Sequence, residues 1–314
     1  MSTYPIILIP KSIENAQNAL PSVPYFTVPK PVKSSDSPQP LEINTLIAES
    51  TIALFVCLGL AFVNSLLGML VGFGCIATIA YHVFTMQRSF PKRKRIHDDA
   101  VRIYPQRLNE YQQARAEHQE KINQIRSPNN VSEYRRKQLL SVLCQTEAYD
   151  GNRSKAQEGF SELKFYAYLN NYFKGKIYRG LTLNIPNFQY PYSPDFTYIN
   201  RELNLYIDIE IDEPYEYMGR QATHYLYSEK DNNRNSFFLF RGWIVIRFAE
   251  EQVVLYPQSC CKAIAKVISN VLGDNSDLMQ FCNVPDLPLL RQWTELEAFE
   301  MSSKQYRETY LAND

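Results

Sequence analysis

Residues 206–212 read Tyr-Ile-Asp-Ile-Glu-Ile-Asp, so that apolar and acidic residues alternate along the run. Side chains on a β-strand point to opposite faces in turn, which puts the three isoleucines on one face and Asp208, Glu210 and Asp212 on the other. The isoleucine face belongs in a core. Like charges on one face of a strand repel one another, so the acidic face requires something cationic beside it.

The segments around this strand predict an α/β domain. Helical and strand patterns follow one another in the order helix, three strands, helix, two strands, helix. The expected elements are helices over 154–173, 229–240 and 259–272, and strands over 177–183, 195–199, 205–211, 243–248 and 253–256. This order predicts one sheet packed between layers of helices.

The preceding predicted strand supplies a fourth acid. With a turn at residues 200–202, we expect Asp195 to lie opposite Asp208 and diagonal to Glu210. Carboxylates at that spacing can lean toward one cation, and carboxylate and carbonyl oxygens are the ligands that Mg²⁺ prefers. The alternative is a polar outer face of an antiparallel strand pair, salt-bridged to Arg or Lys side chains.

A resemblance to a known family bears on this choice. Over residues 151–273 the chain resembles the PD-(D/E)XK nuclease superfamily, which is restriction-endonuclease-like, in its very-short-patch-repair-like branch. The features that carry the resemblance are Gly159-Phe160-Ser161-Glu162, Ser193-Pro194-Asp195-Phe196, Glu210-Ile211-Asp212, and the downstream segments 231–235 and 240–248. The resemblance implies an αβββαβ core with a mixed sheet between helices.

The resemblance also implies a reaction, the hydrolysis of phosphodiester bonds in nucleic acid with Mg²⁺ or Mn²⁺, and it favours DNA over RNA. Asp195, Glu210 and the Ile211 carbonyl would hold the ion. Glu162 would hold a second ion or orient the attacking water. Asp212 would add a ligand or hydrogen-bond to one of these groups.

One departure from the family pattern concerns the basic residue. The family places a lysine two residues after the second acid, where this chain has Asp212. Lys230 and Arg234, on the next predicted helix, are the candidates to replace it. Without a replacement, the domain would be a catalytically inactive relative that binds nucleic acid or a protein partner at the membrane. His224, just beyond the acidic strand, is interpreted as a structural hydrogen-bonding residue, with a role as base or ligand as the alternative.

Residues 51–84 carry no charge and are mostly apolar. A bilayer core takes about 20 apolar residues per helix, so this run predicts a transmembrane hairpin with helices over 46–63 and 66–85 and a turn at Asn64 and Ser65. The alternative is a buried helical hairpin inside a soluble core. The lipid bilayer is thus an expected partner through residues 46–85.

A basic cluster follows the apolar run, at Arg88 and residues 92–95. Clustered Lys and Arg beside a span stay cytoplasmic, so we expect the soluble domain and both termini to be cytoplasmic. The alternative interpretations of the cluster are contacts with nucleic-acid phosphates or with anionic lipid.

Composition excludes some classes of protein. The 33 basic and 33 acidic residues balance, which gives no global sign of nucleic-acid binding, and the six cysteines lack the CxxC spacing of a zinc site. A third functional alternative is a membrane scaffold assembled through helices over 96–146. Whether the chain forms a homo-oligomer is left open by the sequence.

The expected domain organisation has five parts. They are a flexible Pro/Ser-rich tail (1–43), the hairpin (44–86), a basic flank and helical stalk (87–150), the nuclease-like domain (151–273), and a helical extension (274–314) with a surface helix over 289–309.

Overall fold

The computed structural model describes residues 2–40, 42–63, 65–152, 154, 159–216, 218 and 220–311. The chain divides into two compact units. One unit is an α/β unit, which combines Met1–Ser22 with Arg126–Asp314, and the other is a helical unit, Val23–Ile125.

The α/β unit is built on a five-stranded mixed sheet with the strand order β2-β6-β5-β4-β3. Neighbouring strands are antiparallel except β5 and β6, which are parallel. The strands are β2 (Ile6–Leu8), β3 (Ile177–Tyr178), β4 (Phe196–Asn200), β5 (Leu205–Asp212) and β6 (Ile244–Ala249). A second, two-stranded sheet pairs β1 (Thr3–Tyr4) with β7 (Leu290–Arg291).

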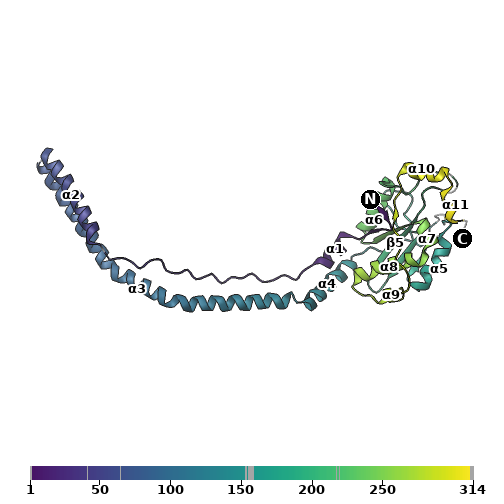
Figure 1. Ribbon diagram of the computed structural model, residues 1–314, viewed down its shortest axis with the longest axis horizontal. Coiled ribbons are helices and arrows are strands. Elements are labelled where there is room, and N and C mark those ends of the chain that lie inside the picture. Colours follow the sequence, from purple (N-terminus) through teal and green to yellow (C-terminus); the bar gives the residue numbers. More distant parts are fainter. Residues whose placement is uncertain are drawn as a thin grey trace. The chain divides into compact units, whose positions relative to one another are not determined.

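Helices pack on both faces of the sheet, so the predicted mixed α/β architecture is confirmed. The three isoleucines of β5 lie in the main core, together with buried residues of α5 (Glu162–Tyr172) and α8 (Pro257–Leu272). The opposite face carries a second core of Tyr206, Val245 and Trp243, to which α6 (Glu229–Phe240) contributes Phe238. In Figure 1, β5 lies among these helices within the α/β unit.

The register of β4 and β5 differs from the expected one. Phe196 pairs with Ile209 and Thr197 with Asp208, which brings Asp195 next to Glu210. The connecting loop is four residues long, because Asn200 and Leu205 still pair, and the shorter turn assumed from the sequence is wrong. Asn204 closes the loop with a positive φ of 52°, a conformation that Asn tolerates better than most residues.

Further elements differ from the prediction. The helix expected over 154–173 begins at Glu162, with positions 155–158 outside the described residues, and the strand expected over 177–183 is limited to Ile177–Tyr178. The strand expected over 253–256 is a helix, α7 (Glu250–Leu255), whose buried side chains include Glu250 and Val253, three residues apart as on one helix face. The single helix expected over 289–309 is divided into β7, α10 (Glu295–Ser303) and α11 (Tyr306–Leu311). The division arises because Thr294 caps α10 in a reciprocal pair with Glu297.

The prediction of a flexible tail over 1–43 is corrected for its first half. Besides β1 and β2, residues Lys11–Asn18 form helix α1, which packs against α4 (Pro128–Leu143). Tyr4 and Ile13 are fully buried. Strands of two and three residues are too short to produce a periodic pattern, which is why the sequence did not reveal them.

The helical unit contains α2 (Ile43–Val63) and α3 (Ser65–Ile125), and α2 packs against the first part of α3 (Figure 1). Helix α3 continues through Pro91 and Pro105, so that the predicted second span, the basic flank and the first part of the stalk form one helix. The rest of the stalk, α4, belongs to the α/β unit, where Leu139 and Leu143 are buried.

Among the described residues, one helical segment is long and apolar enough to cross a membrane, by length and composition alone. It is the segment Met69–Ile125 of α3, whose most apolar window has a mean hydropathy of 1.7.

Replacing Tyr4 by alanine should destabilise the α/β unit by about 3 kcal/mol, because a fully buried aromatic ring and its hydrogen bond to Asp212 are lost. Both tryptophans of the chain, Trp243 and Trp293, lie in this unit, so tryptophan fluorescence during urea unfolding of the full chain in detergent reports on it. Tyr25→Ala is the control, since Tyr25 is 93% exposed. Equal midpoints for the two variants would show that the N-terminal strands do not support the fold.

Candidate functional site

The acidic face of β5 is compensated by two buried arginines. Arg234 from α6 donates to Asp208 Oδ2 at 2.7 Å and to Glu210 Oε1 at 2.6 Å. Arg247 from β6 donates to both carboxylate oxygens of Asp212, to Oδ2 at 3.0 Å and to Oδ1 at 2.7 Å. The interpretation of this face as salt-bridged to Arg side chains is therefore confirmed for all three acids of the strand.

Asp195 lies at the start of β4, against Glu210. Its backbone amide donates to Glu210 Oε1 at 3.2 Å, and its own Oδ2 accepts from the Ile211 amide at 2.8 Å. Burial, followed by the charges of Glu210 and Glu162, raises the pKa of Asp195 well above its usual range. Asp195, Glu210 and the Ile211 amide thus meet where β4 and β5 pair, whereas the sequence predicted Asp195 opposite Asp208 and diagonal to Glu210.

Glu162 and Glu213 approach the same place from two other segments. Glu162 begins α5 and lies 3.4 Å from Arg179 Nη2. A Cβ at Gly159 would stand 2.9 Å from Glu162 Oε1 and 3.2 Å from Glu213 Oε1, so a side chain there would push the two carboxylates away. Glu213 adds its charge to those that raise the pKa of Asp195. The sequence analysis missed Glu213 because it lies just beyond the end of the alternating strand.

The residues near Asp195 fit a divalent cation by their chemistry. In the described part of the chain, no Arg or Lys side chain pairs with Asp195, whereas the negative charges of Glu210 and Glu162 both raise its pKa. Carboxylate oxygens are the ligands of hard cations. However, no group of three or more His, Cys, Asp or Glu side chains among the described residues is already placed to hold a metal ion. The carboxylate donors are present, but three of them are not gathered around one point among the described residues.

The two candidates for the missing lysine differ in position. Arg234 reaches Glu210 directly, and its guanidinium stacks 4.6 Å from the centre of the Phe238 ring. Lys230 is exposed, one turn earlier on α6. The site therefore has Arg234 as its basic group. Asp212 is held by Arg247 and accepts a hydrogen bond from Tyr4 at 3.0 Å, so its role as an additional metal ligand stays a prediction.

A second polar cluster extends from Asp212 toward solvent. His224 Nδ1 lies 3.0 Å from Asp231 Oδ1 and 3.6 Å from Asp212 Oδ1, and its Nε2 lies 4.0 Å from Glu213 Oε2. Arg247 also donates to Asp231 at 2.9 Å. The expected hydrogen-bonding role of His224 is thus confirmed, and the histidine connects this cluster to Glu213.

Sequence reasoning missed Arg247, although a signal for it exists. A single arginine within the apolar strand 244–249 faces the same side as Val245, and an arginine on a buried face requires a buried acid. The β5–β6 register places Arg247 directly beside Glu210. The alternation of β6 could therefore have indicated a partner for the acids of β5.

The charges of this cluster affect its pKa values. Burial opposes the charged form of His224, but Asp212 and the hydrogen bond with Asp231 outweigh burial and raise the pKa of His224. Burial, together with Glu250, raises the pKa of Glu213 to about 7. Since the Glu213 carboxyl has an unperturbed pKa of 4.5, the folded unit binds a proton that the unfolded chain releases between these two values.

The unfolding free energy should therefore fall as pH rises from about 4.5 through 7, because the folded state holds more protons than the unfolded state in this window. Glu213→Gln should reduce this fall and leave the variant more stable than wild type above pH 7, by about 1–2 kcal/mol. The measurement is urea unfolding of the full chain in detergent, followed by tryptophan fluorescence. Glu202→Gln, an exposed loop position, is the control. A pH profile that Glu213→Gln leaves unchanged would contradict the assignment.

The chain was compared with protein-family models, with curated proteins and with solved structures. No family model matches it, and neither a curated protein nor a solved structure is significantly similar to it. The residues and contacts of the site are therefore the basis for assigning a function.

Proposed function

We propose that the α/β unit is a metal-dependent nuclease of the PD-(D/E)XK type, which hydrolyses phosphodiester bonds of nucleic acid, with DNA favoured. The observation that carries the proposal is the contact of Asp195 with Glu210 and the Ile211 amide where β4 and β5 pair, with Glu162 beside them. The order α5, β3, β4, β5, α6, β6 also follows the order that the resemblance implies.

In this proposal Asp195, Glu210 and the Ile211 carbonyl hold Mg²⁺ or Mn²⁺. The bound ion lowers the pKa of a water molecule and neutralises charge on the phosphate. Glu162, at the edge of the same cluster, orients the water. Arg234 keeps its charge at all ordinary pH values, so it positions Glu210 and stabilises negative charge, and it does not act as a base.

One observation favours a second candidate, a domain that binds nucleic acid or a protein partner without cutting. Glu210 is a side chain that the ion requires, and it is already neutralised by Arg234, which donates to it at 2.6 Å. If Mg²⁺ cannot displace this arginine from Glu210, the domain binds nucleic acid or a protein partner without catalysis. The two candidates differ in whether nucleic acid is cut, and whether Mg²⁺ binds at all is measured separately.

The membrane proposal has support from the connectivity of the α/β unit. Residues 2–22 and 126–311 fold into one unit, so both flanks of the apolar segment lie on the same side of any membrane. An apolar segment that enters and leaves on one side crosses an even number of times. We therefore propose that α2 and the start of α3 form a transmembrane hairpin, with the α/β unit and both termini in the cytoplasm because of the basic residues 88–95.

Mg²⁺ should stabilise the wild-type α/β unit by about 2.7 kcal/mol at a concentration of about 100 times its Kd, because only the folded state binds the ion. Asp195→Asn should abolish this effect. Without metal the same variant should be more stable than wild type by about 1 kcal/mol, since a buried and repelled carboxylate is removed. Thermal unfolding by tryptophan fluorescence, with Mg²⁺ or with EDTA, measures both, and Glu202→Gln is the matched control.

Cleavage of plasmid DNA by the full chain in detergent should require Mg²⁺ or Mn²⁺ and should stop with EDTA. Asp195→Asn and Glu210→Gln should each lower the rate at least about 100-fold, because each removes a metal ligand. Single-stranded RNA tests the other substrate class. If Mg²⁺ stabilises the protein and no substrate is cut, the non-catalytic candidate is correct. If Mg²⁺ has no effect on stability, the metal site itself is refuted.

Short epitope tags at the two termini should be accessible from the same, cytoplasmic side of cell-derived vesicles. The physical reason is that β2, which precedes the apolar segment, pairs with β6, which follows it, so both ends of the chain fold on one side of the membrane. Right-side-out and inside-out vesicles, probed with antibody before and after permeabilisation, give the measurement. Tags on opposite sides would contradict both the hairpin and the strand pairing.

A further inference from the structure

Five cations form what we call the basic collar of α3: Arg88, Lys92, Arg93, Lys94 and Arg95. All five are exposed, and none makes an ion pair with a carboxylate in the described part of the chain. The sequence holds no acidic residue between Glu49 and Asp98. The collar is therefore a concentrated positive charge without internal compensation.

The collar surrounds its helix. Successive residues of an α-helix are about 100° apart, so the four residues 92–95 point in four directions around the axis, and Arg88 overlies the first of them. Arg88, Lys92 and Arg95 are spaced four and three residues apart and share one face of the helix, as contact with a nucleic acid would require, whereas Arg93 and Lys94 point to other sides. A membrane that a helix passes through surrounds it on all sides, so it meets all five cations.

The distance of the collar from the apolar segment fits as well. Phe84, at the end of the apolar run 51–84, is 59% exposed on α3. At about 1.5 Å per residue, the collar begins about 6 Å beyond Phe84 and ends about 16 Å beyond it. The headgroup region of one leaflet is about 5–7 Å thick, and the Debye length at physiological salt is about 8 Å. Arg88 therefore lies at the headgroups, Lys92 and Arg93 lie within about one Debye length of them, and Lys94 and Arg95 lie slightly farther out.

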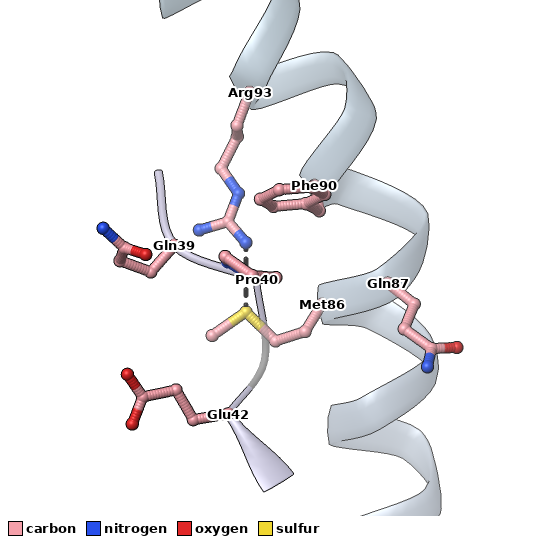
Figure 2. A pocket seen from close by; sticks show the side chains of 7 residues that line it. All are labelled: Gln39, Pro40, Glu42, Met86, Gln87, Phe90 and Arg93. Carbon is pink, nitrogen blue, oxygen red and sulfur yellow. Dashed lines mark hydrogen bonds between the residues drawn. The ribbon is translucent and has the colours of Figure 1, made fainter. Parts of the chain in front are cut away.

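A groove beside the collar adds a place for one headgroup. An open groove of about 400 Å³ lies beside α3 and is lined by Gln39, Pro40, Glu42, Met86, Gln87, Phe90 and Arg93. Figure 2 shows the Arg93 guanidinium over the groove, 3.2 Å from Met86 Sδ, while Glu42 lies at the opposite end. A thioether is a weak acceptor, so the guanidinium remains able to bind a phosphate. Phe90 and Met86 supply the apolar part of the groove beside the guanidinium.

We propose that the basic collar binds the headgroups of anionic phospholipids, with Arg93 and the adjoining groove holding one lipid phosphate. The inference rests on the proposed membrane hairpin. It assigns the collar a ligand, beyond its effect on orientation. Binding of this kind enriches anionic lipid around α3 and weakens at high salt.

The experiment uses the full chain in phosphatidylcholine vesicles that contain a minor share of phosphatidylglycerol. Electron spin resonance of spin-labelled lipids measures the enrichment of each lipid at the protein, at low and at high salt. Wild type should enrich phosphatidylglycerol over phosphatidylcholine. The variant Lys92→Gln, Arg93→Gln, Lys94→Gln, Arg95→Gln should lose this enrichment, by at most about fivefold for each cation that reaches the headgroups.

The matched control neutralises four cations further along the same helix: Arg102→Gln, Arg107→Gln, Arg115→Gln and Lys121→Gln. These positions are exposed and lie beyond the collar, so the control variant should keep the wild-type enrichment. A single-charge pair tests the groove, because Arg93 lines it and Arg95 does not. Arg93→Gln should lower the enrichment more than Arg95→Gln, and inorganic phosphate should displace the lipid no better than chloride of equal ionic strength.

The outcomes separate this proposal from the one it rests on. If the chain floats with the vesicles and the collar variant enriches phosphatidylglycerol as wild type does, the role of the collar is refuted while the membrane hairpin stands. If no form of the chain floats with vesicles, both proposals fail. If the collar variant loses affinity for a DNA duplex in detergent and its lipid enrichment is unchanged, the collar is a nucleic-acid surface and the lipid proposal is wrong.

Discussion

Arg234 and Arg247 reach the acidic face of β5 from two directions, one from the helix that covers this face and one from the neighbouring strand. Without them, three carboxylates would be buried side by side at a cost of several kcal/mol per ion. The arginines are themselves almost fully buried, so each charge depends on its partner. The position of α6 over the sheet, the pairing of β5 with β6, and the attachment of Tyr4 at Asp212 all follow from these contacts.

Asp195 differs from the acids of β5 because no arginine compensates it among the described residues. Burial, and after it the charges of its neighbours Glu210, Glu162 and Glu213, raise its pKa. Structural acids in this unit have a cationic partner: Asp208, Asp212 and Glu250 each contact an arginine at 2.7 Å. Glu210, Glu162 and Glu213 beside Asp195 also lie near an arginine, at 2.6, 3.4 and 4.0 Å, so within this cluster Asp195 alone has no arginine partner among the described residues.

The sequence was informative where a pattern repeats over many residues. The alternation of β5 predicted its two faces, and the helix expected over 229–240 agrees with α6. Short elements gave no such signal, which explains the missed strands around Tyr4 and the helix α7 that was expected to be a strand. The partners of the acids depend on strand register and loop length, which one sequence leaves undetermined: a four-residue loop moved Asp195 from Asp208 to Glu210. Glu213 lies beyond any periodic element, so only the fold brings it to the site.

The edge strand β2 has a consequence for the order in which the molecule assembles. Ile6 pairs with Arg247 and Leu8 with Val245, so about 240 residues separate the paired positions. At about 5–20 residues per second, the ribosome delivers the partner strand on the order of 10–50 s after β2. The apolar residues 43–85 emerge within that interval, while Tyr4 still has no buried environment. Among the strands of the five-stranded sheet, β2 is thus synthesised first and can pair only after β6, and until then it is an unpaired edge that a chaperone or another chain can capture.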